Sequence, residues 1–598
     1  MILHCTPPYG VYTPNPALGY LKGFLQKKGV AVKNVYWNII LEKRIAEFQR
    51  DLADSVDMKV FPELTKLYLS RHLLTDVEQV TPLDLVYKSV YTKKEIQERV
   101  ATIKEDIDQY IKRNNLHKTD IAGFTLKFFQ WPMSCYIIGR LKEMNPDIHV
   151  VVGGITSKSQ GITFMNMLSQ VDFALYGEGE YSLFSLIEAL KEGDLCTVPH
   201  LIYRDDKNIV STQCPPVYED LDVYPFPDYS DYFDLVKKRK SDHPILIPVL
   251  GSRSCAWNKC KFCVLNTGYH YRARSPQNIV KEIEYQSKKY DVYDFVFIDT
   301  EVASNMKRFK TLLKLLIELS TKEDKYHFCA EVSPVFITSE TAKYMQHASF
   351  EQIQIGFEAV TDLLLKKMQK KHQFAHNIQA LKLGSRYQIK VSGLNILREI
   401  PTETKEDIAE SCMNLKFLRF FPGKHFIDPG YLKLFKGAPF YRDVPAGERE
   451  LWRQDPYWAE IAPTQLVDEG DRFELFGFCQ DRRNPQWDIF ESLLKLYVDQ
   501  DCSYTWIEYP EGSFVEEKGI KCCEYTFDRD ETDLLVFCNS IKRFSDIKKK
   551  FFHVDEKKIL NILCTLKEYG VVYYDTNLTS IISLLEADER ITLTLLKK

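Results

Sequence analysis

The sequence predicts an α/β protein with two parallel-sheet regions and an α+β C-terminal region. Three observations support this class. Short apolar runs alternate with helical patterns over residues 1–215, the alternation restarts after a proline- and aromatic-rich stretch at about 224–233, and the pattern becomes irregular beyond about residue 440. Strands separated by helices of this length are typical of parallel sheets.

The first region, residues 1–215, is expected to form a doubly wound, Rossmann-like sheet. MILH and AVKNVYW are predicted strands, joined by a helix that is entered through Pro14 and Pro16. After a polar helical insert at about 38–118, the runs IAGFTL, HVVVGG and VDFALYGEGE are predicted strands, and LIYRDDKNIVS is a predicted closing hairpin. Residues 216–245 are then expected to be a linker.

The second region, residues 246–440, is expected to form a partial (β/α)6 barrel, because about six strand–helix units follow one another without a doubly wound order break. Its predicted strands are ILIPVL, DFVFID, HFCAEV, QIQIGFEA, IKVSGLNIL and YLKLF. Residues 441–598 are expected to be a C-terminal lid or substrate-docking region. Its end, FSDIKKKFFHVDEKKILNILCTLKEYGVVYYDTN, has the helix–turn–helix–hairpin pattern of a small winged-helix module.

Composition and charge argue against a nucleic-acid-binding or membrane-spanning protein. A chain of 598 residues is too long for one hydrophobic core, and a net charge of −4 gives no basic excess for nucleic acid. Since no apolar run approaches the roughly 18 residues that span a bilayer, no membrane segment is expected. Fifteen scattered cysteines and an opening strand, MILHC, without a preceding basic segment favour a reducing, cytoplasmic location without a signal peptide.

Three cysteines lie close together in SRSCAWNKCKFCVLN, directly after the first predicted barrel strand: Cys255, Cys260 and Cys263. Parallel α/β folds build their sites at this end of the strands. A structural zinc site is four-coordinate, and His270 is the only nearby candidate for a fourth ligand. Three thiolates on a four-iron cluster would instead leave one iron open. On spacing alone, zinc and iron–sulfur both remain possible.

With Phe262 directly before the last cysteine, this loop resembles the radical S-adenosylmethionine (SAM) superfamily, although four residues, not the usual three, separate its first two cysteines. Four downstream segments make the chain most similar to the cobalamin-type radical SAM maturases of ribosomally made peptides, the RiPP-maturation C-methyltransferases. They are CVLNTGYHYRARSPQNIVKEIE, HFCAEVSPVFITSETAKYM, IQIGFEAVTDLLLKKMQKKHQFAHNIQALK and VSGLNILREIPTETKEDI. The resemblance covers about residues 1–440.

This resemblance implies that the three cysteines hold a [4Fe–4S] cluster, with SAM on the fourth iron and an electron donor such as flavodoxin or ferredoxin. Ala359 and Thr402 stand where the family usually has serine and glycine. The alternative reading of the polar SAM candidates is that they are helix caps or barrel ion pairs. The implied SAM contacts are Phe262, Glu331, Gly356, Glu358, Asn395 and Arg398.

The N-terminal glycine turns, in VVVGG and ALYGEGE, resemble those of the cobalamin-binding domain that precedes many radical SAM domains. Asp147 and His149 begin the histidine motif D-x-H-x-x-G, but Val152 stands where its glycine is needed. His149 is therefore expected in a strand, and any cobalamin is expected to lack a histidine ligand. The implied cobalamin contacts are Pro16, Leu18, Thr125, Phe129, Gln130, Gly153, Gly154, Gly177 and Glu178.

The resemblance implies methylation of an unactivated carbon, on a precursor peptide. A second hypothesis keeps the same cofactors but performs cyclisation, oxidation or rearrangement on a small molecule or lipid. A third, of another class, is a non-catalytic zinc-binding interaction protein. No residue of the sequence is identified as catalytic beyond the cofactor contacts.

Overall fold

The computed structural model describes residues 1–53, 62–74, 90–206, 208–237, 244–265, 267–322, 325–421, 427–445, 447, 452–454, 472–475, 478–480, 484–500, 502–520 and 522–586. The chain forms two compact units. The first comprises Met1–Ser254, Val264–Val296 and Lys433–Cys479, and the second comprises Cys255–Cys263, Phe297–Leu432 and Gln480–Lys598.

The first unit contains a seven-stranded sheet of order β2-β1-β3-β4-β5-β6-β7. The strands from β2 to β5 are parallel, and β6 and β7 continue the sheet as an antiparallel hairpin. This confirms the expected parallel α/β sheet. The strands are β1 (Ile2–Cys5), β2 (Lys33–Tyr36), β3 (Ile121–Thr125), β4 (His149–Ile155), β5 (Phe173–Tyr176), β6 (Leu201–Asp205) and β7 (Asn208–Ser211).

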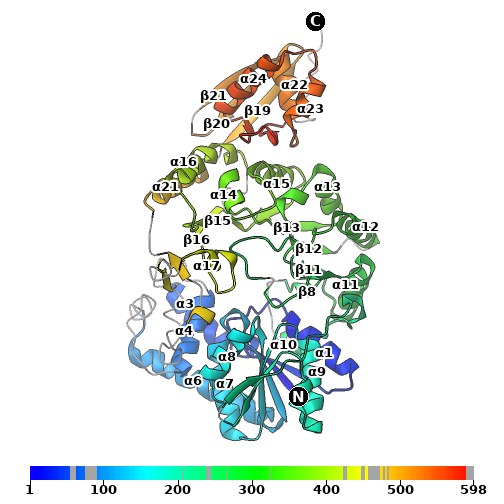
Figure 1. Ribbon diagram of the computed structural model, residues 1–598, viewed down its shortest axis with the longest axis vertical. Helices are drawn as coiled ribbons and strands as arrows, with labels where there is room; N and C mark the ends of the chain where they lie inside the picture. Colours follow the sequence, from blue (N-terminus) through cyan, green and yellow to red (C-terminus); the bar gives the residue numbers. More distant parts are fainter. Residues whose placement is uncertain are drawn as a thin grey trace. The chain divides into compact units, whose positions relative to one another are not determined.

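Helices cover both faces of this sheet, with α7 and α8 on one side and α1 and α9 on the other (Figure 1). Burial on both faces explains why all five residues of β3 are buried instead of alternating with polar ones. Helix α1 begins at Pro16, one of the two prolines through which it was predicted to be entered, and the structure shows that Asn15 caps it. The helices are α1 (Pro16–Lys27), α7 (Trp131–Met144), α8 (Lys158–Met167) and α9 (Gly179–Glu192).

The polar stretch between β2 and β3 is helical in its described parts. Helix α6 (Lys93–Arg113) buries an apolar stripe from Ile96 to Ile111, and Thr92 and Glu95 form a capping box at its start. The other insert helices are α2 (Trp37–Ile40), α3 (Glu42–Ala53) and α4 (Pro62–Leu74). The described part of the stretch predicted as a linker includes the short helix α10 (Ser230–Val236).

A second sheet has the order β14-β13-β12-β11-β8, in which β12, β13 and β14 pair in parallel. Its strands are β8 (Ile247–Val249), β11 (Asp294–Phe297), β12 (His327–Glu331), β13 (Phe350–Gln354) and β14 (Lys390–Ser392). The helices that follow are α11 (Pro276–Tyr290), α12 (Met306–Lys322), α13 (Ser339–His347), α14 (Asp362–Lys367), α15 (Phe374–Arg386) and α16 (Lys405–Asn414).

Two predicted barrel strands differ from the observed ones. IKVSGLNIL is broken at Gly393, whose φ is +65° and whose added Cβ would lie 2.5 Å from Gln354 Cγ, so β14 ends there and β15 (Leu394–Arg398) begins. The last strand is β16 (Ile427–Tyr431), not YLKLF, because it pairs with β15 and the pairing stops where β15 ends. A single bridge between Glu358 and Ile396 connects β15 to the segment after β13.

The C-terminal part of the second unit has its own core, in which Val515, Phe527, Leu563 and Val572 are buried. Its last elements are helices followed by an antiparallel strand pair, and their assignment as a winged helix stays a prediction. The elements are α21 (Gln486–Asp499), β19 (Ser503–Tyr509), β20 (Gly512–Lys518), β21 (Cys523–Asp528), α22 (Arg529–Phe537), α23 (Phe544–Lys550), α24 (Glu556–Glu568), β22 (Val572–Tyr574) and β23 (Ile581–Ser583).

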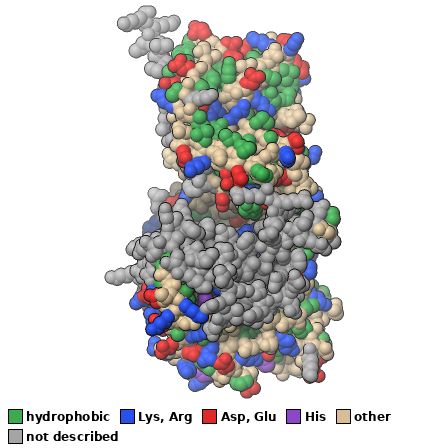
Figure 2. Space-filling model, turned by 90° about the vertical axis from the view of Figure 1, so that its left-hand side faces the viewer, with side chains coloured by type: hydrophobic (Ala, Val, Ile, Leu, Met, Phe, Trp, Pro, Cys, Tyr) green, Lys and Arg blue, Asp and Glu red, His purple; other side chains and the backbone are tan. Residues whose placement is uncertain are grey.

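On the face shown in Figure 2, acidic and basic side chains are intermixed over the described parts. This agrees with the small net charge of −4. Within the described residues, none of the helices has both the length and the apolar character needed to cross a membrane.

Candidate functional site

The cysteine loop, Cys255–Cys263, is anchored on the turn that follows α14. The Lys261 amide donates to the Met368 carbonyl over 3.0 Å, and the Trp257 indole Nε1 donates to the Gln369 carbonyl over 2.8 Å. Both contacts lie within the second unit. The loop therefore rests on a defined support instead of extending freely from β8.

Lys370, next in this turn, brings a positive charge to the loop. Its Nζ lies 3.0 Å from Glu358 Oε1 and 5.7 Å from the centroid of the Phe262 ring. Burial alone would lower the pKa of Lys370, but the Glu358 carboxylate and the nearby Cys260 and Cys263 thiols hold that pKa above its ordinary value. Lys370 is therefore a fixed cation beside the thiols.

The thiols of the loop influence one another. Burial raises the pKa of Cys260 to about 11, Lys370 opposes this, and the nearby Cys263 and Cys255 add to it. The described residues contain no group of three or more His, Cys, Asp or Glu side chains arranged around a single metal ion. A [4Fe–4S] cluster spreads its thiolate ligands over separate irons, so three partly exposed thiols on one loop are a donor set that fits it.

Carboxylates gather near Glu358 at the ends of β11 and β12. Although Glu331 keeps solvent-exposed surface, partial burial and the charges of Glu301, Glu358 and Asp299 raise its pKa to about 6. Glu301 accepts hydrogen bonds from the Ala303 amide at 3.0 Å and the Ser333 amide at 2.9 Å. Glu301 therefore fixes the loops that hold this acidic group.

Two lysines balance these carboxylates. Lys371 Nζ lies 3.3 Å from Glu301 Oε2, as Lys370 does from Glu358 at 3.0 Å. Glu301, Lys370 and Lys371 were not predicted from the sequence. Glu301 stands just after a predicted strand, so the rule that selected Glu331 would have selected it too. The lysines lie in a loop whose sequence carries no such signal.

The structure brings Gly356, Glu358 and Asn395 together. Glu358 has a φ of +59°, its amide donates to the Asn395 carbonyl at 2.8 Å, and its carbonyl accepts from the Leu397 amide at 2.9 Å. A Cβ on Gly356 would lie 2.8 Å from Lys370 Nζ, so glycine lets the lysine approach the backbone.

Arg398, by contrast, is engaged elsewhere within the second unit. Its guanidinium forms an ion pair with Glu491 on α21 and lies 3.9 Å from the centroid of the Tyr431 ring. Its side chain is 11% exposed. A contact of Arg398 with SAM stays a prediction, and it would require the arginine to leave or share these partners.

The cobalamin candidates cluster at the carboxyl ends of the strands in the first unit, where ligands of open α/β sheets bind. The Gln130 side chain donates through Nε2 to the backbone carbonyl of Thr6 at 2.8 Å. The backbone carbonyl of Gln130 accepts in turn from Thr6 Oγ1 at 3.1 Å. Phe129, one residue earlier, has a φ of +60°. Leu18 is buried, and its amide is occupied by the Asn15 side chain at 3.2 Å.

The glycines at these strand ends differ in their surroundings. A Cβ on Gly153 would meet nothing within 4 Å, whereas one on Gly154, with a φ of +75°, would lie 2.8 Å from Thr125 Oγ1. A Cβ on Gly177, with a φ of +76°, would lie 3.2 Å from the Gly268 carbonyl. Of these three glycines, Gly153 alone faces open space. His149 lies at the start of β4, as expected.

Glu178 is enclosed by arginines. It forms ion pairs with Arg253 and Arg272, and its side chain is 6% exposed. Arg253 lies in β9 (Ser252–Arg253) and Arg272 in β10 (Arg272–Ala273), which pair antiparallel on either side of the cysteine loop. The structure thus places Glu178 against the base of the loop.

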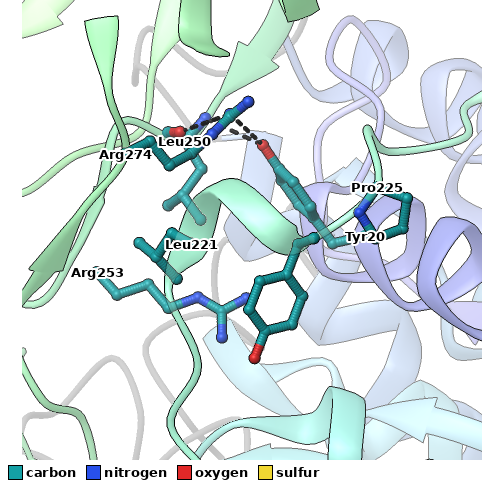
Figure 3. Close-up of a pocket in the computed structure, with 7 residues that line it drawn as sticks. Tyr20, Leu221, Pro225, Leu250, Arg253 and Arg274 are labelled. Atoms are coloured by element: carbon teal, nitrogen blue, oxygen red, sulfur yellow. Dashed lines mark hydrogen bonds between the residues drawn. The ribbon is translucent and has the colours of Figure 1, made fainter.

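A small pocket lies beside the same base (Figure 3), and the sequence did not predict it. Within it, Arg274 donates to the Leu250 carbonyl at 2.9 Å and pairs with the buried Glu282, which also accepts from the Tyr20 hydroxyl at 3.1 Å. Burial alone would lower the pKa of Arg274, but Glu282 and Tyr20 hold that pKa above its ordinary value. The lining residues are Tyr20, Leu221, Tyr224, Pro225, Leu250, Arg253 and Arg274.

Part of this chain matches a known protein family. Residues 249–413 match the family model described as the Radical SAM superfamily. An uncharacterized methyltransferase of Pyrococcus horikoshii is 25% identical over 314 residues, covering 51% of this chain and 64% of that protein. The anaerobic magnesium-protoporphyrin IX monomethyl ester cyclase of Rubrivivax gelatinosus is 25% identical over 333 residues, covering 54% of this chain and 56% of that protein.

Among solved structures, the cobalamin-dependent S-adenosylmethionine radical enzyme OxsB with aqua-cobalamin bound is similar in fold. The TM-score is 0.58 at 15% identity, covering 83% of this chain and 66% of that chain. The chain thus spans less than two thirds of the length of both curated relatives, at 64% and 56%. These findings identify residues 249–413 as a radical SAM domain, within an α/β fold shared with cobalamin-binding radical SAM proteins.

Proposed function

We propose that this chain is a cobalamin-dependent radical SAM enzyme that methylates an unactivated carbon of a ribosomally synthesised precursor peptide. The observation that carries the proposal is the three-cysteine loop docked on the Met368–Lys370 turn, with Lys370 paired to Glu358. The named methyltransferase relative and the cobalamin-dependent structural relative support it.

In this proposal Cys255, Cys260 and Cys263 hold the cluster, and Gly356, Glu358 and Asn395 line the SAM site. The cofactors, when bound, would supply a carbon-centred radical from SAM and a methyl group from cobalamin. The protein keeps the thiols on a fixed support and places the Lys370 cation beside them.

The cobalamin would lie over the carboxyl ends of β1, β3, β4 and β5, where Pro16, Thr125 and Gly153 are found. The division into a cobalamin domain, a linker, a barrel and a C-terminal docking region also belongs to this proposal. So do a cytoplasmic location and reduction by a flavodoxin- or ferredoxin-like donor.

The test is the metal content of protein purified and reconstituted without oxygen in the presence of cobalamin. We expect about four iron atoms and about one cobalt atom per chain, together with reductive cleavage of SAM. Iron without cobalt would remove the methyl carrier. Zinc alone without SAM cleavage would overturn the enzymatic proposal in favour of a zinc-binding protein.

The cyclase relative favours a second candidate, ring closure or oxidation of a small molecule with the same cofactors. The two differ in the product. Methylation adds one carbon, which isotopically labelled methyl-SAM would deliver to the product, whereas cyclisation or oxidation removes hydrogen and leaves the label in methionine. Mass spectrometry of products from peptide and small-molecule candidates therefore distinguishes them.

A further inference from the structure

The segments that flank the cysteine loop contact the end of the N-terminal sheet. Strand β9 precedes the loop and β10 follows it, and they pair through Arg253–Arg272 and Ser252–Ala273. The Arg274 amide also donates to the Gly251 carbonyl at 2.9 Å. The two ends of the loop therefore enter and leave side by side.

A group of four alternating charges joins this base to the segment after β5. Arg253 pairs with Glu178 and Glu180, and Arg272 pairs with Glu178. The exposed fractions of these four side chains are 6%, 7%, 12% and 17% for Glu178, Glu180, Arg253 and Arg272. The two negative and two positive charges cancel. Burial of the group is therefore tolerated only while all four side chains are present.

Aromatic rings and backbone groups fix both arginines further. Arg253 lies 5.2 Å from the centroid of the Tyr224 ring, and Arg272 lies 5.1 Å from that of Tyr218. Arg272 Nη1 also donates to the Glu219 carbonyl at 2.6 Å. Guanidinium groups held by carboxylates and ring faces have little freedom to turn, and lysine could not reproduce this geometry.

The segment after the loop also lies against the strand ends. Gly268 has a φ of +81°, and a Cβ there would be 2.3 Å from the Thr156 carbonyl at the end of β4. Lys127, at the end of β3, lies 5.8 Å from the centroid of the Tyr269 ring. All of these contacts lie within the first unit.

We propose that Glu178 is a positioning residue that, with Glu180, Arg253 and Arg272, clamps the base of the cysteine loop to the segment following β5. This assigns Glu178 a role different from the cobalamin contact that the sequence suggested. The consequence for the cluster rests on the function proposed above, whereas the clamping of the loop base does not.

The test uses the full chain with Glu178→Gln, which keeps the shape of the side chain and removes its charge. The matched control is Glu188→Gln on α9, the helix that follows Glu178, where the ion pair of Glu188 with Lys191 is exposed. In the cluster-free protein, we expect Glu178→Gln to accelerate amide hydrogen exchange in β9 and β10, and Glu188→Gln to leave it unchanged. In the reconstituted protein, we expect Glu178→Gln to lose iron to a chelator on the order of ten-fold faster, with cobalt retained.

Arg272→Lys keeps the charge but cannot bridge as a planar fork, so it should give an intermediate rate of iron loss. Unchanged exchange at β9 and β10 in Glu178→Gln would overturn the clamp. So would loss of cobalt with unchanged iron retention, which would make Glu178 a cobalamin contact. If wild-type protein binds no iron, the proposed function fails, and the exchange experiment still decides whether the clamp exists.

Discussion

The Lys370–Glu358 pair provides the sharpest test of the site's geometry. The perturbation is a double-mutant cycle of Lys370→Met, Glu358→Gln and the two together. At 3.0 Å and an effective dielectric constant of about 20, the attraction between the two charges is about 5.5 kcal/mol. Removing both charges from water offsets much of this, since the side chains are only 14% and 13% exposed.

Each single substitution leaves one charge buried without its partner, which lowers the local free energy of opening around β13 by about 3 kcal/mol. The double variant leaves neither charge, so its loss should be smaller than the sum of the single losses by about 2 kcal/mol. In an amide hydrogen exchange experiment, that coupling corresponds to roughly a 30-fold difference in exchange rate.

Because the chain has two compact units, a single global unfolding transition is not a suitable readout. Amide hydrogen exchange in β13, which ends two residues before Gly356, measures the local free energy instead. Lys366→Met, an exposed lysine on α14, is the control and should leave exchange unchanged. Strictly additive single effects would show that the two charges do not interact.

Three further predictions concern the cofactor sites and pH. Cys263→Ala should abolish SAM cleavage and lower iron content while the fold is retained, and the exposed Cys564→Ala should do neither; cleavage by Cys263→Ala would reject the cluster assignment. Gly153→Phe should fold normally, because nothing lies within 4 Å of its Cβ, yet bind less cobalamin; Gly430→Phe, equally open, is the control, and unchanged cobalt content in Gly153→Phe would count against the site. Since folding raises the pKa of Glu331 from 4.5 to about 6, native protein favours its protonated form, and local stability at β12 should fall as pH rises from 4.5 to 6. Glu331→Gln should flatten this dependence in pH-resolved hydrogen exchange, and an unaltered slope would contradict the pKa shift.

Sequence patterns predicted the parts of this fold that depend on local periodicity. Continuous apolar runs such as HVVVGG marked buried parallel strands, and Pro16 marked the start of α1. The break at Gly393 was missed because a positive φ at glycine depends on the approach of Gln354 from another strand. The end of β16 was missed because it is set by pairing with β15.

The same distinction applies to the site. The cysteine loop was recognised because its spacing is local, and Glu358 because it ends a predicted strand. Lys370 was not recognised, since its approach to Glu358 follows from how the turn after α14 folds back. Glu178 was selected from its position after a glycine, but which partner a carboxylate finds there depends on Arg253 and Arg272, distant in sequence.

The antiparallel pairing of β9 and β10 also bears on when the cofactor enters. Bringing the ends of a loop together costs conformational entropy, and in many small metal proteins the metal itself must supply that free energy. Here the antiparallel ribbon and the charges around Arg253 bring the loop ends together through the protein's own contacts. In the proposed enzyme we therefore expect the loop ends to be joined before the cluster is inserted, so that the folded apoprotein accepts iron and sulfide delivered after synthesis.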